Sequence, residues 1–197
     1  MTHLSAYHLT IEPNTLFHRY APAGLPDDDL SADMQEAIEA RLAAAGFEHY
    51  ETSAFARPGQ RCRHNLNYWL FGDYLGIGAG AHAKISQHDG VWREMRYKQP
   101  AAYLQAVADG APAQNHARIA RGELPFEFMM NALRLTDGFD IALFSERTGL
   151  PVSSIQRELD QAESRGLLAR SLTTLRPTLK GQRFLNDLLT LFLKQGD

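Results

Sequence analysis

The run from Tyr74 to Ile85 constrains the fold more than any other stretch, because its apolar residues are interleaved with positions that have almost no side chain. Those positions are Gly76, Gly78, Gly80 and Ala81. A strand loses packing in this way mainly where another backbone or a ligand must come close. We therefore predict a strand over residues 74–85 of an α/β fold, with Gly78, Gly80 and Ala81 at a ligand.

His82 ends the GIGAGAH segment of this run and is predicted to lie at the strand edge, where open α/β architectures bind their ligands. A ligand contact and a hydrogen bond that caps the strand end remain equal alternatives for its side chain. Ala83 follows and supplies no hydroxyl group, which argues against catalysis at this point. The run is not a dinucleotide-binding fingerprint, since the glycines of GxGxxG open a helix.

A polar and aromatic cluster comes directly before the glycine-rich run. It offers an imidazole nitrogen, an amide and two flat amphipathic rings, supplied by His64, Asn65, Tyr68 and Trp69. Such a set suits a large, planar and partly polar ligand. On a helix Tyr68 would share the face of His64, and Trp69 would flank it. From residue types alone, a hydrogen-bonded loop histidine and a ligand are both open for His64.

The first domain, residues 1–112, is predicted to alternate strands and helices. Its predicted elements are a strand at 4–12, a loop at 13–26, a helix at 30–45, a strand at 47–55, a short helix at 65–71, an edge strand at 91–97 and a helix at 100–109. The strand–loop–helix–strand order at the start predicts a parallel sheet with a crossover helix.

The second domain, residues 113–197, is predicted to be mostly helical and winged-helix-like. Its predicted elements are helices at 124–135, 140–146 and 151–165, a hairpin of 167–171 with 175–178, and a last helix at 180–193. A DNA-recognition helix normally lies in a basic field. Residues 118–197 have eleven Arg or Lys and ten Asp or Glu, a net charge of +1 (11 − 10), so we expect no nucleic acid partner.

One helix of the second domain has an apolar stripe. Phe126, Met129, Met130 and Leu133 recur at the spacing that places side chains on one helical face. We expect this stripe to dock the second domain onto the first. Because methionine adapts to irregular partners, a client protein is the alternative occupant.

Charge and cysteine content exclude several classes of protein. The net charge of −3 gives no general attraction to nucleic acid or anionic membranes. No run approaches the about 20 apolar residues of a membrane span, so we expect a cytoplasmic protein that is not integral to a membrane. Cys62 is the single cysteine, so the chain provides neither an internal disulfide nor the usual ligands of an iron–sulfur cluster.

Three runs resemble the oxygen-independent coproporphyrinogen III oxidase family of radical SAM proteins. They are HLSAYHLTIEPNTLF at 3–17, YETSAFARPGQRCRHNLNYW at 50–69 and GDYLGIGAGAHA at 72–83. They occur in family order over nearly the whole chain, but correspond to only about the C-terminal half of a family member. HNLNYW resembles the HNxxYW pattern of the heme chaperone (HemW-like) branch, which is associated with heme handling. The resemblance therefore implies that His64 is a ligand of heme iron.

The resemblance also implies a fold and further cofactors. The first domain would be the C-terminal portion of a partial (β/α) radical SAM barrel, and the second a helical cover over its open end. The full-length protein would bind S-adenosylmethionine and a [4Fe–4S] cluster on a CxxxCxxC loop. That loop is absent here, which indicates that the sequence begins within a larger protein.

Three functions follow as hypotheses. The first is a chaperone that binds heme near His64 and delivers it to respiratory hemoproteins. The second is an oxygen-independent coproporphyrinogen III oxidase of porphyrin biosynthesis, which decarboxylates its substrate with a SAM-derived radical. The third and weakest is a non-enzymatic winged-helix adaptor. The HNLNYW motif favours the chaperone, and the chain alone is expected to have no oxidase activity.

Overall fold

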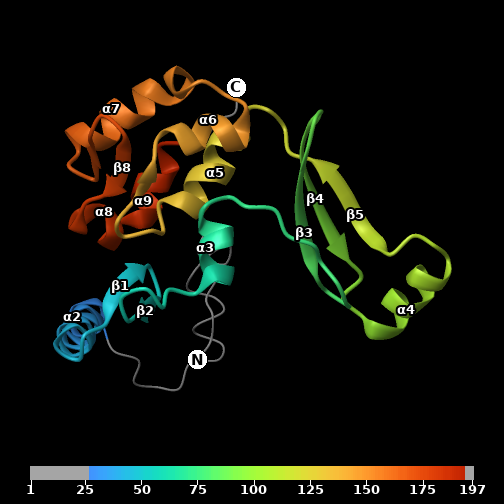
Figure 1. Ribbon diagram of the computed structural model, residues 1–197, viewed down its shortest axis with the longest axis horizontal. Helices are drawn as coiled ribbons and strands as arrows, with labels where there is room; N and C mark the ends of the chain where they lie inside the picture. Colours follow the sequence, from blue (N-terminus) through green and yellow to red (C-terminus); the bar gives the residue numbers. More distant parts are fainter. Residues whose placement is uncertain (1–26, 194–197) are drawn as a thin grey trace. The chain divides into compact units, whose positions relative to one another are not determined.

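The computed structural model describes residues 27–193, and its contacts divide the chain into units of residues 1–45 and 46–197. The first unit contains helix α2, Asp28–Ala44, which confirms the helix predicted at 30–45 (Figure 1). Asp27 caps it by accepting a hydrogen bond from the Leu30 backbone N–H at 2.8 Å. The strand predicted at 4–12 and the loop predicted at 13–26 lie outside the described residues.

The second unit begins with a β-hairpin where the sequence predicts one strand at 47–55. Strands β1 (Glu48–Glu51) and β2 (Ala54–Ala56) pair antiparallel. The buried Glu51 carboxylate accepts hydrogen bonds from the Ser53 backbone N–H at 3.3 Å and from its hydroxyl at 3.2 Å. Such local bonds favour a turn over a continuous strand. The prediction of a single strand at 47–55 is therefore wrong. Among residues 27–193 all strand pairs are antiparallel, so the predicted parallel sheet is not found there.

A three-stranded antiparallel sheet follows helix α3 (Arg63–Trp69). Its strands, in sheet order, are β3 (His82–Gln87), β4 (Gly90–Arg96) and β5 (Ala113–Arg118), and helix α4 (Pro100–Ala108) lies between β4 and β5 in the chain (Figure 1). The predicted pairing of 91–97 with the preceding strand is confirmed, but β4 is the central strand and not an edge. Strand β5 was missed because AQNHAR is polar and mostly exposed. It begins directly after the predicted domain boundary at 112.

The glycine-rich run is mostly a loop, so the strand predicted at 74–85 is wrong. Tyr74 forms only an isolated bridge with Lys84, and regular pairing begins at His82. Gly78 and Gly80 have φ angles of 100° and 72°, outside the range of a strand. A Cβ on Gly76 would lie 2.5 Å from the His82 carbonyl oxygen. At Gly76 the close approach is therefore made to the chain's own backbone, whereas a Cβ on Gly78 would meet nothing within 4 Å.

Residues 119–193 form a mostly helical region with a second small sheet. Its elements are α5 (Leu124–Ala132), β6 (Phe139–Asp140), α6 (Ala142–Thr148), the 3-10 helix η2 (Val152–Ile155), α7 (Gln156–Ser164), β7 (Leu168–Arg170), β8 (Thr174–Pro177), α8 (Leu179–Arg183) and α9 (Leu185–Thr190). The sheet order is β6-β8-β7. The predicted hairpin and the helices at 124–135 and 140–146 are confirmed. The helices predicted at 151–165 and 180–193 each break in two, the latter at Phe184, whose ψ of 44° is not helical.

Phe128 of α5 lies at the centre of the hydrophobic core. Its ring meets those of Phe71, Phe139 and Phe144 edge-on, at centroid distances of 5.6, 5.3 and 5.4 Å. Three residues of the predicted apolar stripe are buried in the same core, together with Val91 of β4: Met129, Met130 and Leu133. The stripe therefore joins α5 to the segments that precede it, and its buried part does not seat a client protein.

Candidate functional site

Helix α3 supports the candidate site and divides its residues between two faces. Three of its side chains pack against the hydrophobic core and hold the helix in place within residues 46–197: Leu66, Trp69 and Leu70. Because residues four apart share a helical face, Asn65 lies with Trp69, and His64 lies with Tyr68. We call the first pair the anchoring face and the second pair the ring face. The short helix predicted at 65–71 is confirmed, and begins at Arg63.

The anchoring face binds the helix to the rest of the unit. The Asn65 amide donates a hydrogen bond to the Tyr50 hydroxyl of β1 at 3.4 Å. The Arg134 guanidinium lies 4.4 Å from the centroid of the Trp69 ring, a cation–π contact. Burial lowers the pKa of Arg134, with the charge of Glu51 acting in the opposite direction. Asn65 and Trp69 are thus engaged by protein groups, and neither lies on the face of His64.

The ring face presents an imidazole beside two phenol rings. His64 is exposed, and the Tyr68 ring meets it edge-on at a centroid distance of 4.8 Å. The Tyr68 ring in turn contacts the ring of Tyr74, 4.3 Å away and tilted by 45°. His64, Tyr68 and Tyr74 therefore form a continuous series of rings, with the imidazole at its exposed end.

Tyr74 is a residue of this site that the sequence pattern does not reveal. Arg93 of β4 donates a hydrogen bond from Nη1 to the Tyr74 hydroxyl at 2.7 Å and one from Nη2 to Glu127 Oε2 at 2.6 Å. Burial raises the pKa of Tyr74, while the charge of Arg93 opposes that effect, so the phenol is neutral at pH 7. The partners come from β4 and α5, and no local motif connects them with Tyr74.

An ion pair fixes the segment directly before Tyr74. The Lys84 side chain is buried, lies 4.3 Å from the centroid of the Phe71 ring, and donates to Asp73 Oδ1 at 2.7 Å. Burial lowers the pKa of Lys84, and the hydrogen bond to Asp73 opposes this effect. Burial alone would raise the pKa of Asp73, but hydrogen bonds from Lys84 and Ser86 outweigh it and lower that pKa. The pair therefore holds the start of the glycine-rich loop against β3.

The glycine-rich loop contacts β4 and α4. The Gly78 N–H donates to the Tyr103 hydroxyl at 3.3 Å, and the Gly80 N–H donates to the Tyr97 carbonyl at 2.8 Å. The Ala81 carbonyl accepts a hydrogen bond from the backbone N–H of Arg96 at 2.8 Å. His82 is exposed and begins strand β3, so it does not lie at the end of a strand. In the part of the chain that the structure describes, no hydrogen bond or ring contact joins this loop to His64. The partners of Gly78, Gly80 and Ala81 thus come from Tyr97, Arg96 and Tyr103, whereas those of His64 come from α3 itself.

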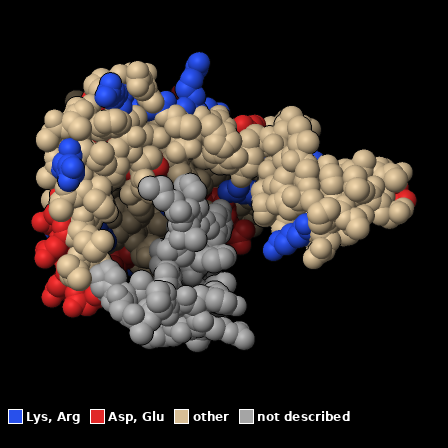
Figure 2. All heavy atoms as spheres, turned by 90° about the horizontal axis from the view of Figure 1, so that it is seen from below, with Lys and Arg blue, Asp and Glu red and all other residues tan. Residues whose placement is uncertain are grey.

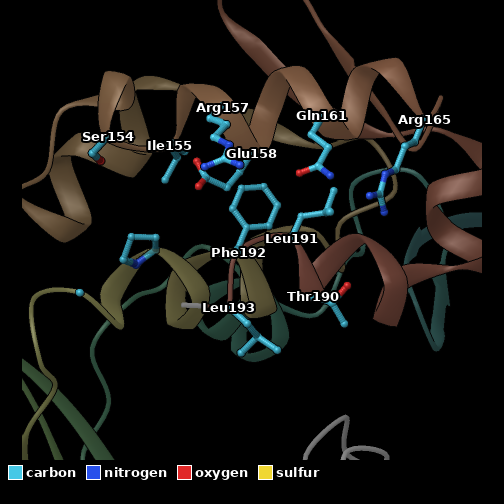
Figure 3. A pocket seen from close by; sticks show the side chains of 12 residues that line it. Ser154, Ile155, Arg157, Glu158, Gln161, Arg165, Thr190, Leu191, Phe192 and Leu193 are labelled. Carbon is cyan, nitrogen blue, oxygen red and sulfur yellow. The ribbon is translucent and has the colours of Figure 1, made fainter. Parts of the chain in front are cut away.

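A pocket of about 560 Å³ lies elsewhere, between α7 and the end of α9 (Figure 3). Ile155 and Phe192 form its apolar wall, and Arg157 and Gln161 of α7 border it together with Arg165, which directly follows that helix. None of the residues of α3 lines it. The pocket is therefore distinct from the site at the ring face.

One face of the molecule shows no single basic area. On the face shown in Figure 2, Lys and Arg side chains lie in separate places among uncharged residues. Two of the arginines near α3 and β4 are paired with carboxylates, Arg61 with Asp137 at 2.6 Å and Arg93 with Glu127 at 2.6 Å. Over residues 27–193, no helix is both long and apolar enough to cross a membrane.

Comparison with known proteins first defines the class of this chain. Residues 119–184 match the family described as the HemN C-terminal domain. The solved structure of coproporphyrinogen III oxidase (HemN) from Escherichia coli, a radical SAM enzyme, is similar with a TM-score of 0.63 and 17% identity, over 85% of this chain and 42% of that one. At that identity the likeness concerns the fold alone. The chain is an α/β protein whose residues 119–184 match the HemN C-terminal domain family.

Within this class, the chain is similar to proteins named heme chaperone HemW. The protein from Escherichia coli is 44% identical over 98% of this chain and 50% of its own length. Those from Haemophilus influenzae and Bacillus subtilis are 41% and 31% identical, over 98% and 97% of this chain and 49% and 51% of their own lengths. These relatives confirm the resemblance to the heme chaperone branch. The chain spans about half the length of the relatives it matches.

Proposed function

We propose that this chain is part of a radical SAM heme chaperone in which the ring face of α3 binds heme for delivery to respiratory hemoproteins. The observation that supports this most is the exposed His64 in the HNLNYW motif, on a chain 44% identical to a protein named heme chaperone. We infer a cytoplasmic protein with heme or porphyrin as its ligand and no nucleic acid partner.

The ring face has the chemistry that heme requires. Imidazole is a common axial ligand of heme iron, and His64 presents an imidazole at the surface. Tyr68 and Tyr74 offer flat aromatic surface beside it. Among residues 27–193, no cluster of three or more His, Cys, Asp or Glu is placed to hold a metal ion.

The roles proposed for the remaining motif residues follow from their contacts. Trp69 and Asn65 hold α3 in place, since their side chains are engaged by Arg134 and Tyr50. Gly78, Gly80 and Ala81 would form a second ligand contact on the separate loop beside α4. His82 is exposed there and is the alternative imidazole.

The residues of this chain do not fit a [4Fe–4S] cluster. Cys62 is its single cysteine, whereas such clusters are held by several thiolates. Residues outside this chain would hold the cluster and S-adenosylmethionine in the full-length protein. We therefore expect the chain alone to have no SAM-dependent oxidase activity.

A coproporphyrinogen III oxidase is the second candidate function, because HemN shares the fold. The chaperone is favoured over it, since the relatives at 31–44% identity have the chaperone name. The sheet order β6-β8-β7 next to α5, α6 and α7 supports a winged-helix-like domain, and with it the weaker adaptor hypothesis. A heme-binding measurement separates the adaptor from the other two functions.

Heme titration of the chain, followed by the Soret absorbance, tests the proposal. We expect the wild-type chain to bind heme with the spectrum of a histidine ligand, and His64→Ala to lose or shift that spectrum. His88→Ala is the matched control, because His88 lies in the exposed turn between β3 and β4. An unchanged spectrum and affinity in His64→Ala would show that His64 is not the ligand, and His82→Ala would then be examined.

A further inference from the structure

We propose that Tyr74, Arg93 and Glu127 position the rings of Tyr68 and His64 for heme binding. Helix α5, which lies within the matched residues 119–184, would thereby contribute a residue to the candidate site. This inference rests on the proposed function, because it concerns the same ring face. It assigns a role to three residues that lie outside the HNLNYW motif.

The contacts form an unbroken series from α5 to His64. Glu127 Oε2 accepts from Arg93 at 2.6 Å, and Arg93 donates to the Tyr74 hydroxyl at 2.7 Å. The Tyr74 ring then lies 4.3 Å from the ring of Tyr68, which meets the His64 imidazole at 4.8 Å. Each member is in contact with the next, and the elements involved are α5, β4, the segment after α3, and α3 itself.

The Arg93 guanidinium donates hydrogen bonds to both Glu127 and Tyr74, and this pair of bonds fixes the position of the Tyr74 ring. A planar guanidinium donates in fixed directions, so bonds to both Glu127 and Tyr74 orient the phenol. The Arg93 and Glu127 side chains are only 28% and 22% exposed, which reduces the screening of their pairing by water. In contrast, nothing in the motif itself orients the His64 ring except the contact with Tyr68.

The position of a ligand imidazole affects both the affinity and the electronic spectrum of bound heme. Groups that orient a metal ligand typically change metal affinity by roughly 10–100-fold when they are removed. Tyr74 acts on His64 through ring packing, a less directional contact than a hydrogen bond, so we expect about a 3–10-fold weakening of heme binding. A change in the Soret maximum or in the electron paramagnetic resonance of ferric heme should accompany it.

Tyr74→Phe and Glu127→Gln, made in this chain, test the inference. Tyr74→Phe keeps the ring and removes the hydroxyl, and Glu127→Gln keeps the side-chain shape and removes the charge. We expect each to weaken heme binding and to shift or broaden the spectrum. The double variant should lose less than the sum of the two single changes, because both act through Arg93.

A destabilised control separates positioning from general loss of structure. Thr148→Val removes a buried hydroxyl that bonds to the Phe144 carbonyl at 2.6 Å, far along the chain from α3. It should lower the melting temperature and leave the heme spectrum unchanged. A spectral shift of the same size in Thr148→Val would overturn the positioning role.

The outcomes distinguish this inference from the proposed function. If His64→Ala loses the heme spectrum while Tyr74→Phe and Glu127→Gln both retain wild-type affinity and spectrum, heme binding at His64 stands and the positioning role is wrong. If His64→Ala itself binds heme as the wild type does, the proposed function fails at this site and the positioning role fails with it.

Discussion

The two faces of α3 have the same sequence spacing and opposite surroundings. Asn65 and Trp69 on the anchoring face contact Tyr50 and Arg134, whereas His64 on the ring face is exposed. A motif of six residues therefore contains both the groups that fix a helix and the group that it presents. This difference shows that a residue of the motif need not be one that can contact a ligand. The predictions below test whether folding and heme binding separate along this division.

Trp69→Ala should produce the largest loss of stability. The indole packs against the hydrophobic core and under Arg134, so its removal leaves a cavity and a partly buried guanidinium without its aromatic partner. We expect the free energy of unfolding in urea to fall by about 3 kcal/mol. A loss below about 0.5 kcal/mol would show that the anchoring face does not anchor the helix.

Asp73→Asn should produce the next largest loss of stability. It tests the ion pair between Asp73 and Lys84, which fixes the segment directly before Tyr74. The change leaves the buried Lys84 without its carboxylate partner at 2.7 Å, so we expect a loss of about 2 kcal/mol at pH 7. The pKa of Asp73 is lowered in the folded state, so its contribution is present above the unfolded value of 3.8 and is lost as the pH falls through the folded pKa. Urea unfolding at pH 7 and pH 3 should therefore show the difference between variant and wild type shrinking at the lower pH. A difference that grows in acid would contradict the assigned pairing.

Asn65→Ala should produce the smallest change. It removes one hydrogen bond of 3.4 Å to Tyr50, so the expected cost is about 0.5–1 kcal/mol in urea unfolding. Because Asn65 does not lie on the ring face, heme affinity should stay within about twofold of wild type. A large loss of heme affinity with little loss of stability would place Asn65 at the ligand and break the division between the faces.

Most helices of this fold were predictable, because their signals are local. Asp27 before α2 is a capping residue, and the i, i+4 spacing of His64 and Tyr68 predicted their shared face. The glycine-rich loop was predicted as a strand because periodicity does not show where φ becomes positive. The missed strands β5 and β6 are, respectively, polar and two residues long, so neither has an apolar pattern to detect.

The candidate site was only half predictable for a related reason. Sequence reasoning predicted that His64 and Tyr68 share a helical face, and the structure confirms that placement. It also grouped them with Trp69 and the glycine-rich loop. In the structure Trp69 contacts Arg134, and Gly78 of the loop donates a hydrogen bond to Tyr103. Tyr74 and its bond to Arg93 depend on the pairing of distant segments, and no single-sequence pattern reports such a pairing.

The most direct test of the account measures heme binding and urea unfolding on the same sample of His64→Ala. If the ring face binds heme and the anchoring face stabilises the fold, His64→Ala should lose or shift the Soret band of bound heme. Its free energy of unfolding should stay within about 0.5 kcal/mol of wild type. An unchanged Soret band, or a loss of stability as large as that of Trp69→Ala, would contradict the account.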